Sequence, residues 1–200
     1  MATPPENSVQ VESRTQWREW LAANHSRSGG IWLITYKKRP GLPYVSYSDV
    51  VEEALCFGWI DSKPNKLDEE CTMLWLAPRQ PGTGWSALNK KRIAAMTAAG
   101  LMMPPGLAKI EAAKQDGSWE KLDAIERLEI PADLAAALAA NATAKANFEA
   151  FPRSARRGIL EWIASAKRAE TRDRRIAETV DQAAQNIRAN SWPRRSPKGR

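Results

Sequence analysis

The sequence predicts an α+β fold, in which a small amino-terminal sheet with helices is followed by an all-helical carboxyl-terminal half that ends in a basic helix pair. Three observations lead to this prediction. Helix and strand patterns alternate as far as residue 79, helix patterns alone follow Trp85, and the excess positive charge lies at the end of the chain. A chain of 200 residues is also long enough to bury a hydrophobic core without disulfides.

Strand patterns are runs rich in β-branched and aromatic residues. They occupy residues 30–38, 59–66 and 71–79. The last two runs are joined by the polar segment LDEE and therefore predict a hairpin. Prolines and glycines in the segment PRQPGTG that follows indicate a loop or linker.

Helix patterns begin at serine, threonine or proline and several of them end at glycine, as capping chemistry favours. Ser13 with Gln16 and Ser46 with Asp49 have the spacing of caps. The predicted helices are residues 13–24, 49–57, 87–99, 105–116, 132–141, 144–151, 154–167 and 171–187. In the last of these, Thr171 is the expected cap, and Ile176, Val180, Ala183 and Ile187 share one face.

These patterns divide the chain into four segments. We expect a flexible amino terminus at 1–12, an α+β unit at 13–79, a helical region at 80–190 with the terminal helix pair at about 152–188, and a disordered basic tail at 191–200. The tail, SWPRRSPKGR, has too little apolar surface to offset the entropy of ordering it.

The charge of the chain is strongly asymmetric. Its formal net charge is +7, yet residues 151–200 hold 13 Lys/Arg and 5 Asp/Glu, a net +8. A basic helix pair can bind nucleic acid weakly through phosphates, although a solvated basic surface with intrachain ion pairs explains the same pattern. The candidate nucleic-acid-binding residues are Arg153, Arg156, Arg157, Lys167, Arg168 and Arg172.

Reactive side chains are scarce. The only histidine is His25, and the two cysteines, Cys56 and Cys71, fit neither a disulfide framework nor a metal-binding spacing. We therefore expect no metal and no cofactor, and structural rather than nucleophilic thiols. The cysteine usage, the lack of a signal-peptide pattern and the lack of an apolar run of membrane-spanning length together predict a cytoplasmic protein.

Cations and tryptophans alternate between residues 59 and 92, which suggests a cleft for a small anionic ligand or a nucleotide. The helix starting at Ser86 offers backbone N–H groups to such an anion, but no glycine-rich phosphate-binding motif is present. The alternative explanation of the nine tryptophans is that they build the core. The candidate ligand-binding residues are Trp59, Asp61, Lys63, Lys66, Trp75, Arg79, Trp85 and Lys90.

Several segments resemble the YdeI/OmpD-associated proteins, also called the OmdA or bacteriocin-protection family. These segments are ALCFGWIDSKPNKLDEE, WSALNKKRIAAM, GLAKIEAAKQDGSW and RSARRGILEWIASAKRAETRDRRI, so that the resemblance spans about residues 12–188. It implies a stress-linked role in resistance to bacteriocins or cationic peptides, with no established catalytic residues. The family name also implies a porin partner, which the missing export signal does not favour.

From residues and resemblance together, we expect a non-enzymatic cytoplasmic binding or stress-protection protein. An enzyme or ligand-binding protein with a tryptophan-lined cationic cleft is the first alternative. Nonspecific nucleic-acid binding through the basic helices is the second. Nothing in the sequence indicates an oligomeric state.

Overall fold

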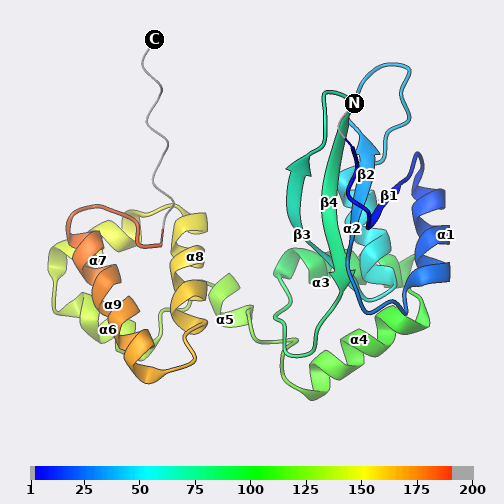
Figure 1. Ribbon diagram of the computed structural model, residues 1–200. Helices are drawn as coiled ribbons and strands as arrows, with labels where there is room; N and C mark the ends of the chain where they lie inside the picture. Colours follow the sequence, from blue (N-terminus) through cyan, green and yellow to red (C-terminus); the bar gives the residue numbers. More distant parts are fainter. Residues whose placement is uncertain (1–2, 191–200) are drawn as a thin grey trace, which may run out of the picture. The chain divides into compact units, whose positions relative to one another are not determined.

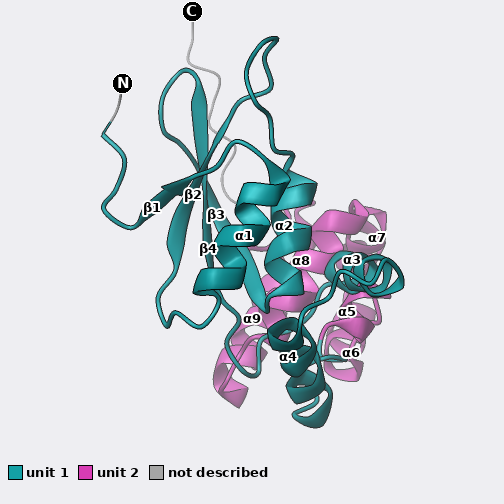
Figure 2. Cartoon of the chain, turned by 90° about the vertical axis from the view of Figure 1, so that its right-hand side faces the viewer, with its two compact units in different colours: residues 1–121 teal, residues 122–200 magenta. Residues whose placement is uncertain are grey.

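The computed structural model describes residues 3–190 and has the predicted α+β fold (Figure 1). The chain forms two compact units, residues 1–121 and 122–200 (Figure 2). The first unit therefore extends well past residue 79, where the pattern changes to helix only. The basic tail expected at residues 191–200 lies outside the described residues.

The first unit combines a four-stranded sheet with four helices. Its elements are β1 (Ser8–Gln10), α1 (Arg14–Asn24), β2 (Ile31–Tyr36), α2 (Tyr47–Cys56), β3 (Trp59–Lys66), β4 (Cys71–Pro78), α3 (Ala87–Ala98) and α4 (Pro104–Gln115). The strand order is β1-β2-β4-β3, with β1 parallel to β2 and the other pairs antiparallel. The predicted hairpin is thus β3–β4, and it carries a register shift between Asp61 and Pro64.

One face of this sheet carries the main core. Leu33 of β2 lies opposite Leu74 of β4, and Ile31 lies opposite Leu76, so all four side chains share the face that α1 and α2 cover (Figure 2). The opposite face holds a smaller cluster around Ile34. Strand alternation therefore sends neighbouring residues into two separate environments.

Helix α2 is buried on two sides. Val50 and Ala54 pack into the sheet core, whereas Val51 and Leu55 pack against Trp85 and the apolar side chains of α3 and α4. Its start is fixed by the predicted Ser46–Asp49 capping box, and at its end Gly58 has a left-handed φ of 76°. Helix α2 is therefore the shared wall between the sheet core and the α3–α4 layer.

A buried acid joins α1 to α2. The carboxylate of Glu53 is only 2% exposed and accepts bonds from Arg14 Nε at 2.6 Å and Arg18 Nη1 at 2.7 Å. A buried charge is tolerated only when it is paired in this way, so the two arginines of α1 have a defined docking point on α2.

The second unit is helical. Its elements are α5 (Asp123–Glu126), α6 (Ala132–Ala139), α7 (Ala142–Ala150), α8 (Arg153–Ala164) and α9 (Ala169–Ala184). Phe148, Leu134 and Ile163 are fully buried at the centre of its core. Within residues 3–190, no helix has both the length and the apolar composition needed to cross a bilayer.

Two short elements differ from the prediction. Residues 8–10, expected within a flexible amino terminus, form β1, because Val9 packs on the sheet core next to Leu33. The short helix α5 was not predicted, since four residues are too few to show a periodicity. Each of these pieces depends on packing against neighbours distant in the chain.

Helix α9 also differs from the prediction at both ends. Its N-cap is Arg168, whose backbone is extended, so Thr171 lies inside the first turn instead of capping it. The helix stops before Ile187 because Asn186 takes a left-handed φ of 58° and the Ile187 N–H returns to the Gln182 carbonyl at 2.8 Å. Ile187 is consequently 48% exposed and does not extend the buried face.

We predict that Glu53→Gln lowers the free energy of unfolding by about 2–3 kcal/mol, measured by urea denaturation. This is less than the cost of breaking a fully buried pair, since the side chains of Arg14 and Arg18 are 35% and 28% exposed. The matched control is Glu69→Gln: the pair of Glu69 with Lys66 is exposed, so this substitution should lower the free energy of unfolding far less than Glu53→Gln does. Equal losses in the two variants would refute a special role for Glu53.

Two helical glycines should respond oppositely to alanine. A Cβ on Gly106 of α4 would lie 2.2 Å from the Cys56 carbonyl oxygen, a backbone atom that cannot move aside, so Gly106→Ala should lower the melting temperature. Gly158 of α8 has open space around the same position, and Gly158→Ala should stabilise by about 0.5–1 kcal/mol. Thermal unfolding of both variants checks this, and a neutral Gly106→Ala would show that α4 does not pack so closely on α2.

Candidate functional site

A cavity of about 420 Å³ lies on the helix-covered side of the sheet, beside the segment 37–46 that connects β2 to α2. Its lining is mainly apolar and aromatic. The lining residues are Leu33, Thr35, Tyr36, Lys37, Lys38, Tyr44, Val45, Tyr47, Val50, Pro64, Thr72, Met73 and Leu74. A concave apolar site with a few polar groups is the usual form of a small-molecule site.

One side of the cavity is held by the hairpin. Lys37 donates its ammonium to the carbonyl of Asp68 at 2.6 Å and to that of Glu69 at 3.2 Å. Arg39 donates to the same Glu69 carbonyl at 2.8 Å. These bonds tie the start of the segment 37–46 to the β3–β4 turn, so the cavity wall does not depend on the connecting segment alone.

Tyr47 is positioned by Asp61, one of the candidate ligand-binding residues. Its hydroxyl donates to Asp61 Oδ2 at 2.7 Å, and the Arg92 guanidinium lies 5.7 Å from its ring centroid. Partial burial and the bond to Asp61 raise the pKa of Tyr47 to about 12. The phenol therefore stays protonated near neutral pH and acts as a fixed wall. The carboxylate of Asp61 is thus bonded to the first residue of α2.

The second lysine of the segment differs from the first. Lys38 is exposed, and within residues 3–190 its ammonium has no hydrogen-bond or ion-pair partner, whereas that of Lys37 is used by the hairpin. Tyr44, which is 48% exposed, lines the same cavity. An unpaired cation and an exposed aromatic ring therefore lie at the rim of an apolar cavity.

Part of the predicted ligand-binding set comes together elsewhere in the first unit. The Arg79 guanidinium lies 3.5 Å from the centroid of the Trp85 ring, which in turn lies 5.1 Å from the Trp119 ring. The ammonium of Lys90 lies 5.0 Å from the Trp119 ring. Arg79 and Trp85 also line a second cavity of about 50 Å³.

The two strand tryptophans lie apart from that cluster. Trp59 is fully buried, donates its indole N–H to the His25 carbonyl at 3.0 Å and packs edge-on against Trp20. Trp75 points to the opposite face of the sheet, where it packs against Trp32 at 5.3 Å. Neither of the two cavities described here includes them, because strand alternation sends them into different packing layers.

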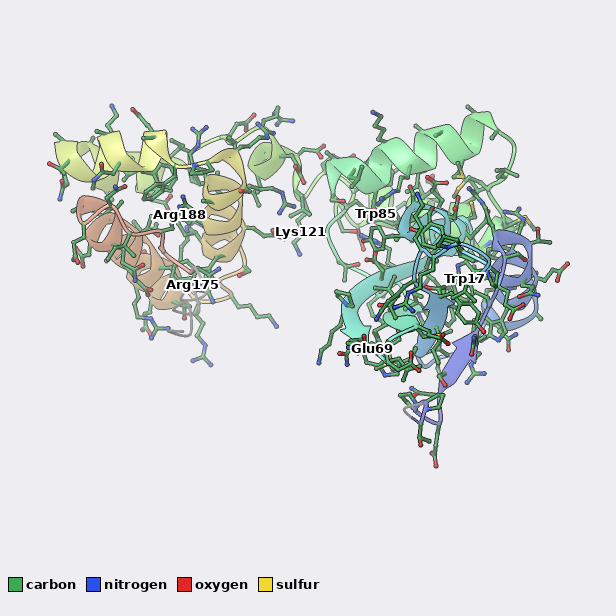
Figure 3. The ribbon with its side chains drawn as sticks, turned by 90° about the horizontal axis from the view of Figure 1, so that it is seen from above. Trp17, Glu69, Trp85, Lys121, Arg175 and Arg188 are labelled. Atoms are coloured by element: carbon green, nitrogen blue, oxygen red, sulfur yellow. The ribbon has the colours of Figure 1, made fainter. Side chains whose placement is uncertain are left out.

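The two candidate lysines of β3 are surface residues. Lys63 is exposed at the register shift, and Lys66 pairs with Glu69 of the following turn. Figure 3 shows Glu69 well away from Trp85 in the first unit. The structure therefore does not gather the eight candidates around one concavity.

The thiols and the imidazole have unreactive surroundings. Burial raises the pKa of Cys56 to about 11, with the nearby Glu53 carboxylate adding to the effect, and burial also raises the pKa of Cys71. His25 caps the end of α1 with its ring near the carbonyls of that helix. Among residues 3–190, no group of three or more metal-binding side chains is present.

Half of the predicted nucleic-acid-binding residues form ion pairs or hydrogen bonds with other residues of the second unit. Arg157 pairs with Glu126 at 3.0 Å and with Glu161 at 2.8 Å. Arg172 pairs with Asp133 at 2.6 Å, and this bond lowers the pKa of Asp133. The guanidinium of Arg153 donates to the Glu126 carbonyl.

The remaining three differ in exposure. Lys167 and Arg168 are exposed, whereas Arg156 is half-buried with its Nε lacking a partner among the described residues. Figure 3 also shows Arg175, which stacks on Trp162 at 5.0 Å. Much of the positive charge of the basic helix pair, α8 and α9, is thus engaged in contacts within the chain.

Sequence reasoning missed the aromatic rim of the larger cavity. Tyr44, Tyr47 and Lys38 flank the Pro-Gly turn of KKRPGLPYVSY, which joins the predicted strand 30–38 to the predicted helix 49–57. The available signal was the presence of two tyrosines in a turn-forming segment, since functional residues often lie in loops held by a rigid scaffold.

The comparisons with known proteins divide along the two units. Residues 127–186 match the family model OmdA, described as Bacteriocin-protection, YdeI or OmpD-Associated. This match confirms the expected resemblance for that part of the chain and does not extend to residues 12–126. Neither the curated proteins nor the solved structures contain a match to this chain. A second model, described as Domain of unknown function (DUF8412), matches residues 9–109, which is 101 of the 200 residues, so the chain belongs to the DUF8412 family.

Proposed function

We propose that this protein is a non-enzymatic binding and stress-protection protein whose first unit takes up a small apolar molecule carrying one negative charge. The observation that carries the proposal is the cavity of about 420 Å³ beside the segment 37–46. Its size suits a ligand with an aromatic ring or a short aliphatic body.

The lining supports the apolar part of this ligand. Leu33, Val50 and Leu74 belong to the helix-covered side of the sheet, and Tyr44 and Pro64 add flat apolar surface. Burial of a ligand against such side chains is favourable by roughly 25 cal/mol per Å² of apolar area. The apolar body would therefore supply most of the affinity.

The negative charge of the proposed ligand is inferred from Lys38. Its ammonium has no partner within residues 3–190, while no carboxylate lines the cavity. A carboxylate or similar anion on the ligand would meet this cation at the rim. Because Lys38 is exposed, its contribution should be small and sensitive to salt.

Recognition is better supported than catalysis at this site. Tyr47 is held as a hydrogen-bond donor to Asp61 and its raised pKa prevents it from serving as a base. The match of residues 127–186 to a bacteriocin-protection model supports a protective role for the whole chain. The free buried cysteines support a reducing location, the cytoplasm.

The binding experiment uses phenylacetate and 4-phenylbutyrate, with the uncharged phenylacetamide for comparison. Methyl NMR signals of Leu33, Val45, Val50 and Leu74 should shift saturably. Lys38→Ala should weaken binding of the carboxylates about threefold, the scale of an exposed ion pair, and leave the amide unaffected. Tyr44→Ala should weaken all three because it removes apolar contact area.

Lys145→Ala is the charge-matched control, since Lys145 is an exposed lysine of α7 in the second unit. It should bind every probe like the unchanged protein. The proposal is wrong if none of the probes shifts these methyl signals, or if Lys145→Ala and Lys38→Ala weaken carboxylate binding equally.

A further inference from the structure

Arg79 is a buried cation with an incomplete set of partners. It follows β4 directly, and its backbone N–H donates to the Gly58 carbonyl at 2.9 Å. Its side chain is only 4% exposed. One guanidinium nitrogen, Nη2, donates to the Gly84 carbonyl, whereas Nε and Nη1 are buried without a hydrogen-bond partner among the described residues.

Trp85 compensates for only part of this burial. The guanidinium lies 3.5 Å from the indole centroid, and Trp85 is itself only 2% exposed. A cation–π contact offsets only part of the free-energy cost of removing an ion from water. Burial lowers the pKa of Arg79 to about 10, so the group is still charged at neutral pH. Among residues 3–190, this buried positive charge therefore forms no ion pair.

The cavity that Arg79 lines is small and carries a second cation. Its volume is about 50 Å³, and it is lined by Arg79, Gln80, Pro81, Trp85, Lys109, Ala112, Ala113, Asp116 and Ser118. Asp116 also lines this cavity and keeps its negative charge, but its oxygens accept from the Ser118 N–H at 2.8 Å and the Gly82 N–H at 3.1 Å and form no ion pair with Arg79.

We propose that this cavity binds one small monovalent inorganic anion, of the size of chloride, as the counter-ion of Arg79. The unpartnered N–H groups of the buried guanidinium supply donors, and Lys109 supplies a second positive charge. The volume excludes a nucleotide, and the Trp85 face is already covered by the guanidinium, so a planar ligand cannot stack there. This site shares no lining residue with the larger cavity and does not depend on its ligand.

The test is thermal unfolding of the full chain in sodium chloride or sodium bromide, with sodium gluconate keeping the ionic strength constant. An anion that binds only the folded state should raise the melting temperature in proportion to the logarithm of its concentration above the dissociation constant, by roughly 5–10 °C at about 100 times that constant. Arg79→Met should abolish this rise. Lys109→Met should shift the onset of the rise to a several-fold higher halide concentration.

Arg27→Met is the matched control, because Arg27 also lies over an indole, that of Trp20 at 5.9 Å, but is exposed. It should keep the full halide response. If Arg79→Met does not fold, an anomalous bromide peak beside Arg79 in bromide-soaked crystals still decides the matter. Identical melting curves in chloride and gluconate, or a soaked crystal with only water beside Arg79, would overturn the proposal.

Discussion

The pairing of Glu53 with Arg14 and Arg18 is the constraint on which the first unit depends. A carboxylate at 2% exposure is stable only with its cations in place, so α1 has one docking position on α2. That position presses Trp17 and Leu21 into the sheet core, where Trp17 also donates its indole N–H to the Val50 carbonyl. Helix α2 is thereby held against the sheet along its length.

Both candidate sites follow from the position of α2. At its start, Tyr47 and Val50 line the larger cavity. On its outer side, Val51 and Leu55 pack with Trp85, the residue that covers Arg79. A shift of α2 would therefore alter the apolar cavity and the environment of the buried guanidinium together, although the two cavities share no residue.

Local signals in the sequence predicted most elements, because caps act within one turn. Ser46 and Ser86 cap the helices expected to start there, Gly58 follows the end of α2, and the hairpin forms from the two strand runs joined by LDEE. The prediction failed at β1, which forms only beside β2 and so depends on long-range packing, and at the end of α9, where Asn186 takes a left-handed backbone conformation. The candidate site was predicted only in part. Arg79 and Trp85 are close in sequence, which was enough to predict that they lie together. Sequence distance could not show that Trp59 and Trp75 lie on opposite faces of the sheet.

The two cavities differ in the balance of charge and apolar surface, and this difference determines what each can recognise. The larger one has an apolar interior, and the unpaired cation at its rim, Lys38, is still in water, so charge adds little to affinity and ligand shape dominates. In the smaller one, Arg79 is already removed from water when the protein folds. An anion that binds there therefore interacts with this cation in surroundings of low dielectric constant, where the attraction is stronger. A loosely specific apolar site and a strongly electrostatic one can therefore coexist in a unit with only inert thiols.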